Sequence, residues 1–176
     1  MIKNRRTKLV NGHFIERLQL AVTEVNGCAA CSYAHAYVAL KQGMSNEEIQ
    51  SFLSNDGEFI KPEEAKAILF AQHFADTRMH PKKDAYQSIT DEYGEEKAKI
   101  ILSAAQLMTV GNISGIPYSA FVSRIKGKPY QDSSLVYELG MQIAGLFFLP
   151  VALVQGLLRT IMGLPNFRLD ESNAIQ

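Results

Sequence analysis

Two cysteines and a histidine share one short segment of this chain. Cys28 and Cys31 are separated by two alanines, and His35 follows four residues after the second cysteine. At about 100° per residue, the three side chains fall within one stripe of an α-helix. Two thiols at this spacing can form a reversible disulfide, and a histidine beside them can move a proton near neutral pH. The segment therefore predicts thiol redox chemistry.

The start of a helix favours the reactive form of such thiols. Asn26 and Gly27 interrupt the preceding segment, so a new helix is expected to begin around Cys28. Its first amides lack intrahelical acceptors and the helix macrodipole is positive there, and both effects favour thiolate over thiol. Thiols in C-x-x-C motifs have pKa values of roughly 3.5 to 7.5, compared with about 8.5 for free cysteine. We therefore expect a useful fraction of thiolate at neutral pH.

A dithiol of this kind can react in two ways. Attack of a thiolate on a hydroperoxide gives a sulfenic acid, and the neighbouring thiol then condenses with it to a disulfide. The same pair can instead exchange with a disulfide of a partner protein. Its closeness to the helix start slightly favours Cys28 as the attacking thiol.

The elements that must position these residues are helices. Ile15, Leu18 and Val22 recur at three- and four-residue steps, which indicates an amphipathic helix directly before the dithiol. Gly43 is placed to end the helix that begins around Cys28. Further helices are expected at 45–53, 62–75, 81–93, 95–110 and 120–125, and within 133–164.

Capping and breaking signals set the ends of these helices. Ser45 followed by Glu48 is a capping box, which opens the helix at 45–53. Pro62 can occupy the first position of the next helix. Pro117 and the glycines before it predict a loop or kink after the helix at 95–110.

The fold class follows from what the pattern contains and lacks. No segment shows the alternating β-branched residues bounded by turns that predict strands. The chain has 176 residues without a linker or a low-complexity tract, a length that fits one domain with a sizeable core. We predict a single all-α domain over residues 1–176, with the redox motif within 16–35.

Charge and cysteine usage limit the partners and the compartment. Eighteen basic and eighteen acidic residues cancel, so no general electrostatic attraction draws the chain to nucleic acid or anionic lipid. Two cysteines are too few for a disulfide-stapled secreted scaffold. The basic N-terminal segment lacks the apolar run of a signal peptide. We therefore expect a cytoplasmic protein without a nucleic-acid partner.

The segment from Leu139 to Leu158 contains no charged residue and is about as long as a membrane span. Pro150 would break or kink one long helix there. Two shorter buried helices that meet near Pro150 explain the pattern without a membrane. We therefore assign the apolar region 133–164 to the core or to a subunit interface.

A glutamate upstream of the dithiol completes a known pattern. Eleven residues separate Glu16 from Cys28. With the C-x-x-C pair and the histidine four residues beyond it, the segment resembles the AhpD-like proteins of the carboxymuconolactone decarboxylase superfamily. This resemblance implies an all-helical bundle that assembles as a homo-oligomer, a trimer or a hexamer, and that acts as a peroxidase or a thiol–disulfide carrier.

The resemblance also implies a role for each residue of the motif. Cys31 would react with the peroxide, Cys28 would resolve the product, and Glu16 and His35 would form a proton relay. The substrate would be a hydroperoxide, the electron donor a thiol protein, and no cofactor would be needed besides the disulfide. Some members of this superfamily carry a second histidine directly before the second cysteine, where this chain has Ala30. Members that act as decarboxylases generally lack the cysteine pair, so its presence argues against lactone decarboxylation.

Two other interpretations of the cysteine pair stay open. The thiols could be buried by chance in a helical assembly module without catalytic activity, because cysteine packs well in cores. Alternatively Cys28, Cys31 and His35 could bind zinc, with Glu16 or His13 as the fourth ligand. Structural zinc sites usually show a second paired motif, and the sequence contains none.

Overall fold

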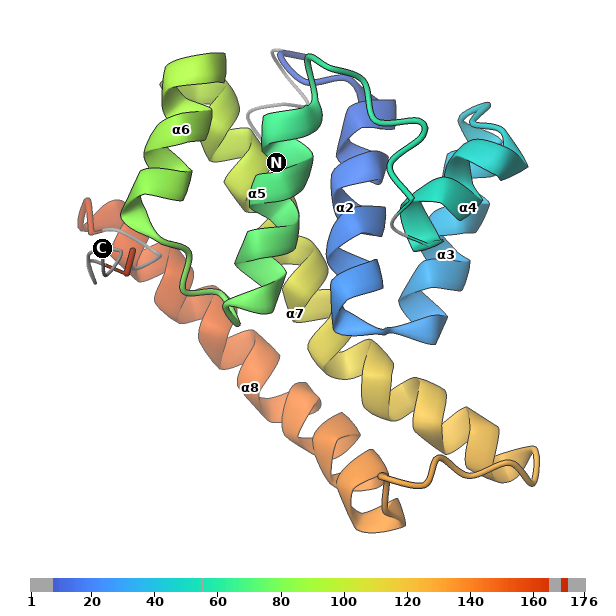
Figure 1. Cartoon of the computed structure of the whole chain (residues 1–176). Helices are drawn as coiled ribbons and strands as arrows, with labels where there is room; N and C mark the ends of the chain where they lie inside the picture. The colour runs from blue at the N-terminus through green and yellow to red at the C-terminus, as the bar shows by residue number, and fades with distance from the viewer. Residues whose placement is uncertain (1–7, 55, 165–168, 171–176) are drawn as a thin grey trace, which may run out of the picture.

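Helices form nearly all of the regular structure in this computed structural model, which describes residues 8–54, 56–164 and 169–170 (Figure 1). Within these residues the only β feature is an isolated parallel bridge between Lys82 and Asp170. The prediction of a single all-α fold is confirmed for the described part of the chain. The helices are α2 (Gly12–Asn26), α3 (Ala29–Lys41), α4 (Asn46–Ser54), α5 (Ala65–Asp76), α6 (Lys83–Tyr93), α7 (Glu95–Ile125) and α8 (Leu135–Ile161).

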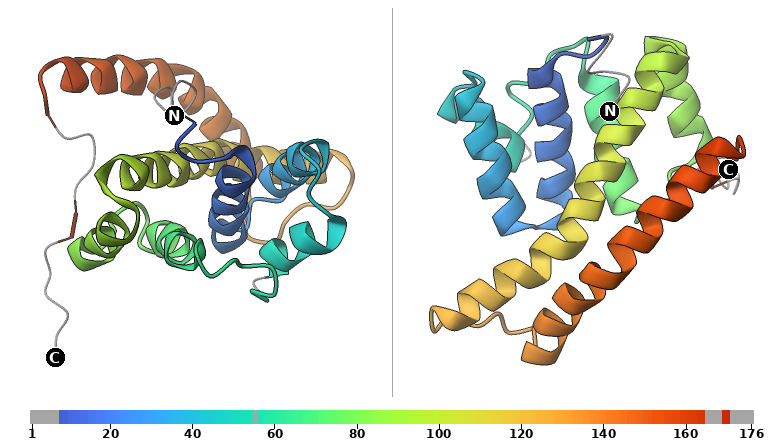
Figure 2. Two further views of the ribbon diagram at one scale, coloured as in Figure 1. Left: turned by 90° about the horizontal axis from the view of Figure 1, so that it is seen from above. Right: turned by 180° about the vertical axis from the view of Figure 1, so that it is seen from behind.

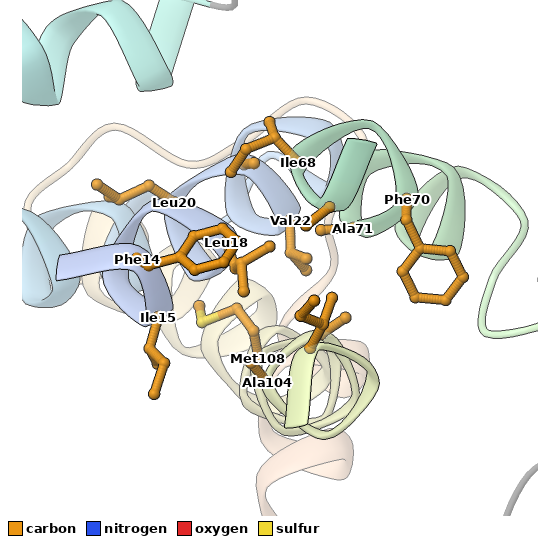
Figure 3. Packing of buried hydrophobic residues seen from close by; sticks show 14 of the residues in the cluster. Phe14, Ile15, Leu18, Leu20, Val22, Ile68, Phe70, Ala71, Ala104 and Met108 are labelled. Carbon is orange, nitrogen blue, oxygen red and sulfur yellow. The ribbon is translucent and has the colours of Figure 1, made fainter. Parts of the chain in front are cut away.

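Helix α2 is the centre of the molecule. It packs against α3, α4, α5 and α7, and Figure 1 shows it between the α3–α4 pair and α5. Every residue from Phe14 to Thr23 is buried, because neighbouring helices cover α2 on all sides. Figure 3 shows Leu18 and Val22 pointing toward side chains of α5 and α7. This burial fixes the direction of each polar side chain on α2, including that of Glu16.

A buried arginine ties α2 to the two segments that follow α3. The Arg17 guanidinium donates to Glu48 at 2.7 Å and to both carboxylate oxygens of Glu64 at 3.1 Å. Burial raises the pKa of Glu64, and the adjacent Arg17 charge opposes this rise. Half of the predicted capping box is present, since the Ser45 hydroxyl accepts the Glu48 amide at 3.1 Å. The other half is missing, because the Glu48 side chain is bound to Arg17 instead of the start of the helix. The predicted start of the next helix at Pro62 is wrong, since α5 begins at Ala65.

Helix α7 is continuous, which excludes the loop but not the kink that the sequence predicts after residue 110. The helix runs through both glycines, Gly111 and Gly115, and through Pro117. Pro117 has no amide hydrogen, so one intrahelical hydrogen bond is missing there. The Ser119 hydroxyl donates to the Gly115 carbonyl at 2.8 Å, and α7 is packed against α2, α3 and α8. This tertiary packing outweighs the local breaking signals.

Helix α8 is also continuous, and the prediction of two buried helices meeting near Pro150 is wrong. A single helix passes through Pro150, and Glu138 is its one buried residue. The assignment of 133–164 to the core is therefore wrong as well. Helix α8 packs mainly along α7, and the left view of Figure 2 shows most of it apart from the other helices. Its apolar side chains remain exposed because no other segment of the described chain covers them.

Two helices of the described chain, α7 and α8, are long and apolar enough to cross a membrane by length and composition alone. Half of the most apolar stretch of α7 is buried inside the molecule, as in a core helix. None of the corresponding stretch of α8 is buried. Of the two helices, α8 is thus the one whose apolar surface is not covered by the rest of the described chain.

Candidate active site

A left-handed turn places the dithiol at the first turn of α3. Gly27 follows the end of α2 with a φ of 67°, a conformation that glycine adopts without steric cost. Its amide donates to the Thr23 carbonyl at 2.9 Å, which closes the C-terminus of α2. Cys28 is then the N-cap of α3, and Cys31 lies in the first turn. The predicted break and the predicted helix start are both confirmed.

Cys28 and Cys31 form a disulfide in this structure. The Cys31 amide donates to the Cys28 sulfur at 3.3 Å, so this sulfur takes the place of a capping oxygen. The two residues differ in access: Cys28 is 0% exposed, whereas Cys31 is 9% exposed and lines a cavity. A reagent that enters this cavity meets the Cys31 sulfur first.

Glu16 and His35 are in direct contact beside the dithiol. The Nδ1 atom of His35 on α3 lies 2.9 Å from Oε2 of Glu16 on α2. The other carboxylate oxygen of Glu16 accepts from Gln42 at 3.5 Å, at the end of α3. If Nδ1 carries the proton that Glu16 accepts, Nε2 is the ring nitrogen left to accept a proton from a reacting group. The structure thus joins all four residues of the motif in one site.

The opposite wall of the site is Gly115, which the sequence marked only as part of a break. A Cβ atom at Gly115 would lie 2.4 Å from the Cys31 sulfur and 2.6 Å from the Cys28 sulfur. Real Cβ atoms do not approach other atoms so closely. Only glycine therefore lets the α7 backbone lie directly against the disulfide.

Two further residues of α7 hold the turn and the start of α3. Ser119 accepts the Ala30 amide at 2.9 Å, one of the amides at the helix start that lack an intrahelical acceptor. Asn112 accepts from Asn26 at 2.9 Å and donates to Thr23 at 3.1 Å. Sequence reasoning missed both residues because they lie more than eighty positions from their partners. The available signal was a set of polar residues within an otherwise apolar helix.

Two cavities open beside the first turn of α3, and Ala30 and Tyr118 line both of them. The cavity in front of Cys31 has a volume of about 510 Å³, and its lining includes His35 and Met108. The second has about 380 Å³ and includes Lys126. A small organic molecule fits either space, and only the first one reaches a sulfur atom.

The zinc alternative finds no ligand set in the part of the chain that the structure describes. No group of three or more His, Cys, Asp or Glu side chains is arranged there to hold a metal ion. Both sulfur atoms belong to the disulfide, and Glu16 is engaged with His35. The contacts of the site are those of a dithiol beside an acid–base pair.

Known proteins match the part of the chain that carries this site. Residues 11–73 match the model of the carboxymuconolactone decarboxylase family, a range that contains the motif from Glu16 to His35. An uncharacterized protein of Bacillus subtilis (strain 168), YdfG, is 27% identical over 120 residues, which are 65% of this chain and 80% of that protein. No solved structure matches the chain significantly. The match over residues 11–73 agrees with the resemblance that the spacing of the motif indicated, while Gly115 and the rest of α7 lie outside the matched range.

Proposed function

We propose that this relative of the carboxymuconolactone decarboxylase family is a dithiol oxidoreductase that reduces hydroperoxides. One observation carries the proposal: Cys31, half of a disulfide at a helix start, lines a cavity together with His35, which is bound to Glu16. The family match supports it, because the superfamily includes AhpD-like peroxidases. A role in antioxidant defence would follow from this chemistry.

The reaction begins with both cysteines reduced. The Cys31 thiolate attacks the terminal oxygen of the hydroperoxide, so that an S–O bond forms and the O–O bond breaks. The departing alkoxide takes a proton from protonated His35 and leaves as the alcohol. The Cys28 thiol then attacks the sulfenic sulfur of Cys31; the S–S bond forms and water leaves. The two thiols supply the two electrons that reduce the peroxide.

Access favours Cys31 as the attacking residue. The helix start alone points to Cys28, whose sulfur already accepts an amide hydrogen. Cys28 is fully buried, however, and a peroxide could reach its sulfur only after the first turn of α3 opened. Cys31 needs no such opening. In this mechanism the buried Cys28 is well placed to resolve, because its partner lies in the same turn.

The Glu16 carboxylate orients His35 and balances its charge. It accepts the Nδ1 proton, which leaves Nε2 to carry the proton that the alkoxide needs. Its negative charge lies beside the ring that passes the proton to the alkoxide. In this proposal Glu16 is a positioning residue and His35 is the general acid.

Regeneration requires a thiol donor. A thiolate of a partner protein attacks the Cys31 side of the disulfide, which faces the cavity, and a mixed disulfide forms. A second thiol of the donor then releases the reduced enzyme. The cytoplasm keeps such donors reduced, so we place the protein there.

The exposed face of α8 supports assembly with further copies. Leu146, Phe147 and Leu153 are all large, apolar and mostly exposed. Contiguous apolar surface of this kind marks an interaction site. We propose that copies of this chain cover it in a homo-oligomer, and the family resemblance favours a trimer or a hexamer.

The test counts thiols and peroxide together. One equivalent of hydroperoxide added to the reduced protein should consume both thiols and the peroxide. Cys28→Ser should still consume peroxide and accumulate a sulfenic acid that dimedone traps, and Cys31→Ser should consume none. Two free thiols and unconsumed peroxide in the unsubstituted protein would refute the enzyme and leave a non-catalytic assembly module.

A further inference from the structure

Gln19 is a polar residue that the mechanism above does not use. It lies on α2 three residues after Glu16, so the two side chains are neighbours on one face of the helix. The residue is only 5% exposed, although an amide side chain usually remains at the surface. It lines the cavity of about 510 Å³ in front of Cys31.

Gln19 has no hydrogen-bond partner for its side-chain amide within the described chain, although the residue is 5% exposed and lines this cavity. No fully enclosed side-chain nitrogen or oxygen of the described residues, however, lacks a partner. Together these statements mean that the amide atoms are accessible, and the cavity in front of Cys31 is an open space that the residue lines. A buried polar group without a protein partner calls for a functional explanation.

The rest of the cavity lining offers few hydrogen-bond donors to a bound hydroperoxide. Leu107 and Met108 of α7 make the wall apolar. His35 already uses Nδ1 to bind Glu16, and Tyr118 is half exposed at the edge of the cavity. The Gln19 amide is thus a buried neutral donor on the cavity that Cys31 also lines, and its protonation does not change with pH.

We propose that Gln19 is a catalytic residue that binds the hydroperoxide and donates a hydrogen bond to the oxygen that leaves. This inference rests on the proposed function. As the Cys31 thiolate forms the S–O bond, the electron pair of the O–O bond moves to the departing oxygen. The Gln19 amide stabilises that charge until His35 supplies the proton. A donor aimed at developing charge acts more strongly in the transition state than in the ground state.

The experiment compares Gln19→Leu with a matched control. Gln50→Leu makes the same change at an exposed position of α4, away from the cavity. For each reduced protein, the rate constant for oxidation is measured with hydrogen peroxide and with cumene hydroperoxide. In the same proteins, alkylation of Cys31 by iodoacetamide reports the thiolate fraction and the access to the sulfur.

Gln19→Leu should lower both oxidation rate constants by about a hundredfold to a thousandfold, since loss of one such donor has effects of this order. The alkylation rate should stay unchanged, and Gln50→Leu should match the unsubstituted protein. Gln19→Glu, which keeps the shape and replaces the donor with a negative charge, should lose at least as much. This second variant keeps the test valid if the leucine disturbs folding.

Three results would overturn the inference alone: equal oxidation rates in Gln19→Leu, a parallel fall in alkylation, or an effect confined to cumene hydroperoxide. The second would indicate a structural role and the third a role in cavity shape. If the unsubstituted protein consumes no hydroperoxide, the proposed function fails, and this inference fails with it.

Discussion

Gly115 is the residue at which one added carbon atom would disturb the site most. The two sulfur atoms lie 2.4 and 2.6 Å from the position of an added Cβ, so α7 and the disulfide could not both keep their places. Gly111, one turn earlier on α7, has open space at the corresponding position. The two glycines therefore form a matched pair on the same helix.

Gly115→Ala should destabilise the oxidised protein by about 1–3 kcal/mol, the usual cost of overpacking a filled site. Gly111→Ala should instead stabilise it by roughly 0.5–1 kcal/mol, because alanine is the better helix former. Chemical denaturation of both oxidised variants measures the difference. A Gly115→Ala protein as stable as Gly111→Ala would contradict the packing of α7 against the disulfide.

The contact between Glu16 and His35 allows a second comparison. Glu16→Gln keeps the shape of the side chain but removes the negative charge that lies 2.9 Å from Nδ1 of His35. The rate of peroxide reduction should fall by about tenfold to a hundredfold, which is less than the loss of a general acid itself because Glu16 acts through His35. Steady-state kinetics across pH measures the effect.

Glu24→Gln is the control for this substitution, since Glu24 lies on the same helix outside the site. It should retain the full rate. Unchanged kinetics in Glu16→Gln would remove Glu16 from the proton relay.

At the scale of elements, one ion pair holds the corner between α7 and α8. Arg124 donates to both carboxylate oxygens of Glu138, at 2.7 and 2.9 Å, and Ser133 donates to one of them at 2.7 Å. The hydrogen bonds from Arg124 lower the pKa of Glu138 below its ordinary value of 4.5. The pair therefore stabilises the corner only while the carboxyl is ionised.

This lowered pKa sets the pH range in which the ion pair of Arg124 and Glu138 stabilises the folded protein. The contribution of Glu138 is complete above pH 4.5 and is lost as the pH falls through the lower pKa of the folded state. Glu138→Gln should flatten the dependence of the unfolding temperature on pH in that acidic range. Glu63→Gln, at an exposed position, should keep it. Identical acid profiles for Glu138→Gln and the unsubstituted protein would contradict the prediction.

At the scale of the whole molecule, α8 is the helix whose apolar side chains stay exposed in the single chain. Leu146 is 75% exposed in the middle of an uncharged stretch of α8, whereas Leu69 is an isolated exposed leucine on α5. If copies of the chain cover α8, a charge at Leu146 would be buried without a partner, which is strongly unfavourable. A charge at Leu69 would stay in water.

Leu146→Glu should therefore shift the protein from the oligomer to the monomer, and Leu69→Glu should leave the oligomer intact. Light scattering coupled to size-exclusion chromatography, without detergent, gives the mass of each. A monomer in every sample would contradict assembly. A protein that needs detergent and partitions onto phospholipid vesicles would identify a bilayer as the cover of α8.

Local signals predicted the part of the fold that contains the chemistry. The helix before the dithiol, the break at Gly27 and the start of α3 depend on residues three or four positions apart, and all three predictions are confirmed. The continuity of α7 and the exposure of α8 could not be predicted in this way. Packing against other helices overrides the breaking signals at Pro117, and apolar residues in α8 indicate burial without saying which surface provides it.

The sequence by itself determined the dithiol, its place at a helix start and its stripe with His35, because these depend on spacing within one helix. Only the tertiary structure decided that Cys31 is the accessible sulfur, that Glu16 contacts His35, and that Gly115 lies against the disulfide. Those facts join segments far apart in the chain, and the packing of α2, α3 and α7 sets them. No spacing rule within a single element contains that information.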